Sequence, residues 1–145
     1  MKKSEICIIG CGYVGLPLIL ALSRYYNVTG YDINKERVKY LNKKYKKRNF
    51  LKTKNLINFK NDFNNLKNCK VFIVTLPTPL NFKNLPDLKG IINISRKISK
   101  ILKKNDLIIY ESTVFPGATE DIFLPQLTKF NKLKINKDFW IGYSP

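Results

Sequence analysis

Hydrophobic residues in this chain gather in several short runs that contain almost no polar positions. An apolar run of this length, without alternation of polar residues, is typical of a strand that is buried on both faces of a parallel sheet. The sequence therefore predicts buried strands at residues 5–10 and 70–76. Further strands are predicted at residues 27–32, which end in an acid, and at residues 106–111 and 139–144.

Between these runs the apolar positions follow the spacing of an α-helix. Residues 14–25 form the first such segment, with Pro17 near its first turn, where a missing N–H costs little. Asn34 can cap a second helix that runs to Tyr45. Asp87 is expected to cap a third. The residues of this third helix that we expect to face inward are Leu88, Ile91, Ile94, Ile98 and Ile101.

The remaining segments are less regular. Residues 56–59 suit a short strand, and residues 62–68 suit a single helical connection. The prolines of "PTPLNFKNLPD" exclude regular structure and predict a loop over residues 77–87. The stretch "STVFPGATED", residues 112–121, predicts a turn that leads into another helix.

Strand-like and helix-like segments thus alternate along the whole chain. Parallel strands joined by right-handed helical crossovers are the arrangement that this alternation favours. We expect an α/β fold with a doubly wound, Rossmann-type parallel sheet and helices on both of its faces. We expect residues 1–145 to form a single domain.

Composition limits the classes of protein that fit this pattern. The chain has 145 residues, of which 44% are hydrophobic, and this is enough to form a core. No apolar run approaches the ~20 residues of a membrane span. The glycine-rich turn described below comes too early in the chain for a signal peptide. We therefore expect a cytoplasmic protein without a membrane partner.

The net charge of +17 raises the alternative of a nucleic-acid-binding protein. The excess is mostly lysine and is spread along the chain, whereas a nucleic-acid reader more often gathers arginines and stacking aromatics on one face. The densest stretch, residues 42–54, suits a solvated helix end and loop, with an anion-binding surface as the other interpretation. We therefore expect no nucleic-acid partner.

Cysteine and histidine usage argues against a metal site. The chain has no histidine and no C-x-x-C pair, and its cysteines are Cys7, Cys11 and Cys69. Two of these lie close together in the sequence and the third is distant. We expect no metal and no disulfide framework, with all three thiols buried or half-buried in a reduced state.

The candidate chemistry lies where the first strand meets the first helix. "GCGYVG" has the spacing G-x-G-x-x-G, with glycines at Gly10, Gly12 and Gly15. The first allows a tight bend, the second lets a pyrophosphate approach the backbone, and the third lets the helix lie close to the sheet. The N–H groups of the helix N-terminus then face the phosphates. On its own this pattern also fits a glycine-rich turn that binds no ligand.

An acidic residue at the end of the second predicted strand favours the dinucleotide interpretation. Asp32 follows Gly15 at close to the expected spacing of ~20 residues. Its carboxylate can accept both ribose hydroxyls of an adenosine and would repel a 2′-phosphate, so NAD is favoured over NADP. A helix cap is the structural alternative for Asp32. Arg37 either lies near the adenosine or is an ordinary surface arginine.

Two further loops follow the carboxyl ends of predicted strands, where ligands bind in such sheets. "TLPTP" at residues 75–79 contains Thr78 and Pro79, and "ESTVFPG" at residues 111–117 contains Ser112 and Thr113. Their prolines would hold the threonine hydroxyls rigidly near the cofactor. Composition alone would make both segments ordinary turns.

The longer motifs resemble a known family. "GCGYVGLPL", "GYDINKERV", "VTLPTPL", "LIIYESTVFPGATED" and "DFWIGYSP" have the order and spacing of the N-terminal NAD-binding domain of the UDP-glucose/GDP-mannose dehydrogenase family. The resemblance covers essentially the whole chain. It is greatest to the branch that acts on UDP-N-acetylhexosamines, in particular the Vi-antigen type of UDP-N-acetylglucosamine 6-dehydrogenase.

The resemblance implies an activity and a set of cofactor contacts. The family oxidises the C6 alcohol of a nucleotide sugar to a carboxylate with two NAD in succession, for polysaccharide biosynthesis. The positions that match its NAD contacts, or that flank them in the same loops, are Tyr13, Val14, Asp32, Arg37, Thr78, Pro79, Ser112 and Thr113. Thr113 also matches the family threonine that positions catalytic water or the substrate hydroxyl, so it is our candidate catalytic residue.

The same resemblance implies that parts of the family enzyme are not represented. The family has a central domain that carries a lysine and the interface of a homo-oligomer. Its C-terminal domain carries a nucleophilic cysteine, which none of Cys7, Cys11 and Cys69 matches. We expect this polypeptide to bind NAD but not to turn over a UDP-sugar by itself. A stand-alone nucleotide-binding module or pseudo-enzyme without dehydrogenase activity is the alternative.

Overall fold

The computed structural model describes residues 5–45 and 55–144. Residues 46–54, which make up most of the lysine-rich stretch considered above, lie outside the described part. The chain forms two compact units, Met1–Thr75 and Leu76–Pro145. Each unit contains parallel strands with helices packed against them or joining them.

The first unit is built on parallel strands in the order β3-β2-β1-β4. In this register Ile6 of β1 lies opposite Val28 of β2 and Val71 of β4. The carboxyl ends of these strands therefore meet at one edge, where ligands bind in open α/β sheets. The bounds are β1 (Ile6–Ile9), β2 (Val28–Tyr31), β3 (Ile57–Lys60) and β4 (Val71–Val74).

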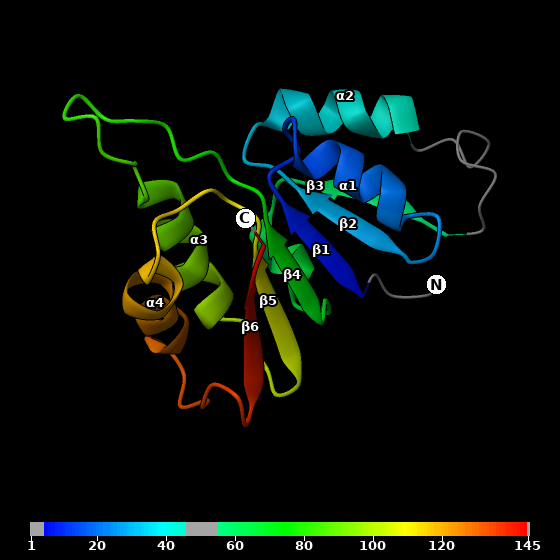
Figure 1. Ribbon diagram of the computed structural model, residues 1–145. Helices are drawn as coiled ribbons and strands as arrows, with labels where there is room; N and C mark the ends of the chain where they lie inside the picture. Colours follow the sequence, from blue (N-terminus) through cyan, green and yellow to red (C-terminus); the bar gives the residue numbers. More distant parts are fainter. Residues whose placement is uncertain (1–4, 46–54, 145) are drawn as a thin grey trace. The chain divides into compact units, whose positions relative to one another are not determined.

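The connections of the first unit are helical, as Figure 1 shows. Helix α1 (Gly15–Leu22) joins β1 to β2 and contacts both, and α2 (Lys35–Tyr45) joins β2 to β3 and contacts β3. A short 3₁₀ turn, η1 (Phe63–Leu66), leads into β4. The predicted cap of α2 is present, because the Asn34 side-chain oxygen accepts the N–H of Arg37 at 2.9 Å.

The buried runs form the core of this unit as their composition indicated. All four residues of β1 and all four of β2 are buried. From the helices, Ile19 of α1 and Leu41 of α2 are completely shielded from solvent. The first helix is shorter than predicted, since the segment from Ser23 onward forms turns in which Arg24 N–H donates to the carbonyl of Ala21.

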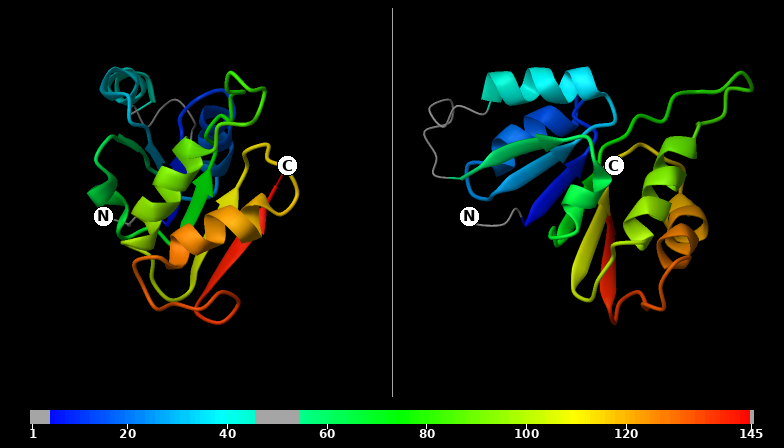
Figure 2. Two further views of the ribbon diagram at one scale, coloured as in Figure 1. Left: turned by 90° about the vertical axis from the view of Figure 1, so that its left-hand side faces the viewer. Right: turned by 180° about the vertical axis from the view of Figure 1, so that it is seen from behind.

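The second unit contains parallel strands β5 (Asp106–Tyr110) and β6 (Phe139–Tyr143). Three helical segments accompany them. They are α3 (Lys89–Ser99), the π-helical turn η2 (Thr119–Phe123) and α4 (Leu124–Thr128). Figure 1 and both views of Figure 2 show α3 and α4 side by side along one side of β5 and β6. The loop predicted over residues 77–87 is present.

The prediction that Ile101 faces inward from the third helix is wrong. Ile91, Ile94 and Ile98 are buried as expected, but α3 ends at Ser99 and Ile101 is only half-buried. The chain tightens there, because the Ile101 N–H donates to the carbonyl of Ile98 at 2.9 Å. This shifts the inward direction by one residue, so that Leu102 is buried instead.

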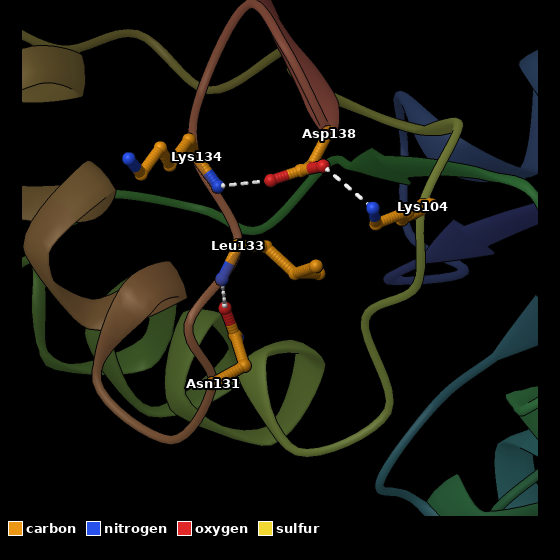
Figure 3. Close-up of polar contacts among 5 residues, drawn as sticks. All are labelled: Lys104, Asn131, Leu133, Lys134 and Asp138. Atoms are coloured by element: carbon orange, nitrogen blue, oxygen red, sulfur yellow. Dashed lines mark hydrogen bonds and ion pairs between the residues drawn. The ribbon is translucent and has the colours of Figure 1, made fainter.

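The segment that leads into β6 is held by polar contacts, drawn in Figure 3. The Asp138 carboxylate accepts the backbone N–H of Lys134 at 2.9 Å and lies 3.3 Å from the Lys104 ammonium group. The Asn131 side-chain oxygen accepts the N–H of Leu133 at 3.0 Å. These contacts fix the turn before Phe139, whose side chain is fully buried.

Candidate functional site

The glycine-rich segment forms a tight turn between β1 and α1. Gly10 has a φ of 103°, in the region that favours glycine, and its N–H donates to the Tyr31 carbonyl at 2.8 Å. The chain therefore bends sharply at the carboxyl edge of the sheet. Helix α1 starts at Gly15 without a side-chain cap at Val14, which leaves its N-terminal amides without that competitor.

The other two glycines of the turn face opposite environments. A Cβ at Gly15 would overlap the Gly10 carbonyl and lie 2.6 Å from the Thr75 hydroxyl oxygen, so only glycine lets the helix approach this closely. A Cβ at Gly12 would meet nothing within 4 Å. The backbone at Gly12 is thus open to an approaching ligand, as a pyrophosphate-binding turn requires.

Asp32 and Arg37 both hold Cys11, which lies in the turn. One Asp32 carboxylate oxygen accepts the Cys11 N–H at 3.0 Å, and the other accepts the Asn34 N–H at 2.9 Å. The Arg37 guanidinium donates from Nε and Nη2 to the Cys11 carbonyl, at 3.2 and 2.9 Å. Arg37 is therefore not a free surface side chain, and its cation lies beside the turn.

An open pocket of about 450 Å³ adjoins this arrangement. Its lining residues are Gly12, Tyr13, Leu16, Pro17 and Arg37. The Tyr13 side chain is fully exposed and that of Val14 is half-exposed. The structure thus brings together the predicted residues from Gly10 to Gly15 with Asp32 and Arg37, all in the first unit.

The remaining predicted residues gather in the second unit. The Thr78 hydroxyl donates to the Thr113 carbonyl at 2.8 Å, and the Ser112 hydroxyl donates to the Leu76 carbonyl at 2.6 Å. The Pro79 carbonyl accepts the N–H of Asp87 at 2.8 Å. The two loops are therefore tied to each other, and the Thr113 side chain remains exposed.

The cysteines are buried thiols, as the sequence predicted. Cys7, Cys11 and Cys69 are reduced, and each is at least 97% shielded from solvent. Burial raises the pKa of the Cys11 thiol to about 12, with a further contribution from the Asp32 carboxylate. Burial and a hydrogen bond with Cys69 raise the pKa of Cys7 well above its usual value. Thiols in such settings are poor nucleophiles.

The described residues contain neither a candidate metal site nor a helix that could cross a membrane. Within residues 5–45 and 55–144, histidine, cysteine and acidic side chains form no cluster that could hold a metal ion. In the same ranges, none of the helices has the length and apolar content that a bilayer crossing requires.

Sequence reasoning missed one residue of the turn. Thr75 follows β4, and its hydroxyl donates to the carbonyls of Gly10 and Ile9 at 2.9 and 3.1 Å. The signal was a lone hydroxyl at the end of an otherwise apolar strand. Its partner lies 65 residues earlier in the chain, so only pairing of β1 with β4 brings the two together.

The chain is similar to sugar-nucleotide dehydrogenases along its whole length. It is 42% identical to UDP-N-acetyl-D-glucosamine 6-dehydrogenase of Pseudomonas aeruginosa and 36% identical to the enzyme of the same name from Salmonella typhi. All of this chain is covered in both comparisons. It spans only 36% and 35% of the length of those relatives.

Solved structures share the fold. A GDP-mannose dehydrogenase from Pseudomonas aeruginosa superposes with a TM-score of 0.87 over 97% of this chain and 36% of its own, at 23% identity. A UDP-D-ManNAc dehydrogenase from Pyrococcus horikoshii gives a TM-score of 0.85 over 97% of this chain and 35% of its own, at 29% identity. The prediction of a doubly wound, Rossmann-type α/β fold is confirmed.

The family model for the NAD-binding domain of the UDP-glucose/GDP-mannose dehydrogenases matches residues 4–145. The open backbone at Gly12, the uncapped start of α1 and the Asp32 carboxylate fit the NAD that this family binds. By this match the chain belongs to the UDP-glucose/GDP-mannose dehydrogenase family, as its NAD-binding domain.

Proposed function

We propose that this chain is the NAD-binding domain, spanning residues 1–145, of an enzyme that oxidises the C6 hydroxyl of a UDP-N-acetylhexosamine to a carboxylate with two NAD. The substrate class follows from the names of the two bacterial relatives above, which are UDP-N-acetyl-D-glucosamine 6-dehydrogenases. Such uronates would serve polysaccharide biosynthesis. The observation that supports NAD as the cofactor is the glycine turn with the Asp32 carboxylate beside it.

The residues of the first unit would hold the adenosine diphosphate half of the cofactor. The open backbone at Gly12 and the positive N-terminal end of α1 would receive the pyrophosphate. The Asp32 carboxylate would accept the ribose hydroxyls. Each of its oxygens accepts one backbone N–H, which fixes the carboxylate while leaving capacity for a further hydrogen bond.

A carboxylate in this position also bears on the choice between NAD and NADP. A 2′-phosphate would bring like charge against the Asp32 carboxylate. Two of the five Arg37 N–H donors, on Nε and Nη2, are engaged with the Cys11 carbonyl, which leaves fewer of them for a 2′-phosphate. We therefore expect the chain to prefer NAD.

The second unit carries the hydroxyl-bearing loops that the family resemblance assigns to the hydride-transfer chemistry. When bound, NAD accepts the hydride. The tie between Thr78 and the Thr113 backbone holds the second loop, and the Thr113 hydroxyl would orient the substrate oxygen or a water without carrying charge. Thr113 is our proposed catalytic residue on this basis.

We further propose that the 145-residue chain does not complete the oxidation alone. The second oxidation in this chemistry needs an accessible thiolate that forms a covalent adduct with the aldehyde. Cys7, Cys11 and Cys69 are all buried, and the pKa of Cys11 is about 12. Steady production of the uronate, with two NADH for each UDP-N-acetylglucosamine, by the purified chain would contradict this.

Calorimetric titration with NAD and NADP tests the proposal. The chain is expected to bind NAD more tightly than NADP. Asp32→Ala should weaken NAD binding and reduce the preference over NADP, because the repelling carboxylate is gone. The matched control is Asp62→Ala, which removes a carboxylate that caps η1 through the N–H of Asn64. No heat of NAD binding at millimolar concentration, or the same preference in Asp32→Ala, would refute the cofactor assignment.

A further inference from the structure

The hydroxyl of Thr75 lies where β1 ends and the glycine turn begins. Thr75 directly follows β4 and is buried. Its backbone N–H continues the ladder by donating to the Ile9 carbonyl at 2.9 Å. Its hydroxyl proton is shared between the carbonyls of Gly10, at 2.9 Å, and Ile9, at 3.1 Å. The same oxygen would lie 2.6 Å from a Cβ at Gly15, so it also lies beside the start of α1.

This contact holds one end of a peptide plane that Asp32 holds at the other. The carbonyl of Gly10 and the N–H of Cys11 belong to the same planar peptide unit. Thr75 donates to its carbonyl, and Asp32 accepts from its N–H at 3.0 Å. The next peptide unit joins Cys11 to Gly12, and Arg37 donates to its carbonyl. The first two peptide planes of the turn are therefore oriented by side chains from three separate elements.

We propose that Thr75 is a positioning residue of the dinucleotide site, whose hydroxyl sets the peptide plane from which the phosphate-binding turn starts. The inference rests on the proposed function, because the turn must bind NAD for its orientation to matter. Thr75 acts through Gly10 and does not itself touch the cofactor. Amides at a phosphate site contribute fully only when they are aimed in advance, since reorienting them on binding costs free energy.

Substitutions of Thr75 separate the hydroxyl from the volume of the side chain. Thr75→Val keeps the shape but removes the donor, and Thr75→Ser keeps the donor. The Thr75→Val chain is expected to bind NAD about tenfold more weakly, which is the order of one lost hydrogen bond. Thr75→Ser should stay within about twofold of the unsubstituted chain. Thr29→Val is the matched control, because Thr29 is also buried but lies within β2.

Amide resonances supply a readout that a purely structural role would not move. In the ligand-free chain, ¹H–¹⁵N signals of Cys11 and Gly12 should shift in Thr75→Val and stay in place in Thr29→Val. If Thr75→Val does not fold, Thr75→Ala removes the hydroxyl without bringing a methyl group against the Gly10 carbonyl and gives the same comparison.

The outcomes distinguish this inference from the proposed function. If the unsubstituted chain binds no NAD, the proposed function fails and this inference fails with it. If that chain binds NAD and Thr75→Val binds it equally well, with or without a lower melting temperature, only the role of Thr75 is refuted. Weaker binding by Thr75→Val with restored binding by Thr75→Ser supports it.

Discussion

Adding one methyl group at Gly15 should damage both the stability of the chain and its binding of NAD. In Gly15→Ala the new Cβ overlaps the Gly10 carbonyl and comes within 2.6 Å of the Thr75 hydroxyl oxygen. The overlapped atom belongs to the backbone of the turn, which β1 and the Thr75 hydroxyl hold in place. The clash cannot be relieved by rotating a flexible side chain, so the turn or α1 must move.

The size of the effect can be worked from these contacts. Overfilling a packed site costs typically 1–3 kcal/mol, and a backbone clash belongs near the upper end, at about 3 kcal/mol. Replacing glycine by alanine in a helix returns up to about 1 kcal/mol. The net loss in the free energy of unfolding is therefore about 2 kcal/mol. For a chain of this size it corresponds to a melting temperature roughly 6–8 °C lower.

Gly12→Ala is the matched control within the same turn. A Cβ there would meet nothing within 4 Å, and Gly12 does not have a positive φ, so the folded chain should tolerate it within about 0.5 kcal/mol. The methyl group would, however, occupy the open space where a pyrophosphate must approach. NAD binding should weaken by about tenfold or more without a matching loss of stability.

Thermal unfolding followed by circular dichroism, together with calorimetric titration of NAD, measures both quantities. Gly15→Ala should lose stability and binding, and Gly12→Ala should lose binding alone. The reasoning is refuted if Gly15→Ala melts within about 1 °C of the unsubstituted chain. It is equally refuted if Gly12→Ala is destabilised as much as Gly15→Ala, or if it binds NAD normally.

Two further predictions concern the three cysteines and the Asp138 carboxylate. The three thiols should resist iodoacetamide at pH 7.5 in the folded chain and react in urea, because all are buried and the pKa of Cys11 is about 12. Fast labelling of the folded chain, detected by mass spectrometry, would contradict this. A hydrogen bond from the backbone N–H of Lys134, and the nearby Lys104 ammonium group, hold the pKa of Asp138 below its ordinary value of 3.8. The ionised Asp138 carboxylate therefore stabilises the folded chain above pH 3.8, and this stabilisation is lost as the pH falls through the lowered pKa. Urea unfolding should therefore show that Asp138→Asn is less stable than the unsubstituted chain at pH 6, with a smaller difference in stability near pH 3. An equal difference at both pH values would overturn the assignment, and so would the same pattern in the exposed control Glu36→Gln.

Local chemistry was enough to predict most elements of this fold. Strands β1 and β4 lie within their predicted apolar runs, because a strand buried on both faces disfavours polar residues. The cap at Asn34 was also predictable, since the capping oxygen and the N–H of Arg37 are only three residues apart. The three thiols could be expected in the interior because the chain has no C-x-x-C pair or other spacing typical of a metal site or a disulfide framework.

The spacing of apolar residues could not predict where α3 ends. An unbroken helical pattern placed Ile101 inward, yet the helix stops at Ser99 and Leu102 takes the buried position. The Ser99 hydroxyl oxygen accepts a hydrogen bond from the backbone N–H of Phe130, and the Ser99 carbonyl accepts one from the side-chain amide of Asn131. These partners come from a segment over thirty residues later, which no local pattern around Ser99 indicates.

The candidate site divides in the same way between sequence and structure. The glycine spacing and the acid at Asp32 identified the kind of ligand, because a phosphate-binding turn needs particular residues at particular places in the chain. The sequence could not show that Asp32, Arg37 and Thr75 each hold the turn, since these hydrogen bonds join residues 21 to 65 positions apart. Such contacts exist only once the register of β1 with β2 and β4 is set, so the tertiary structure alone decided how the turn is aimed.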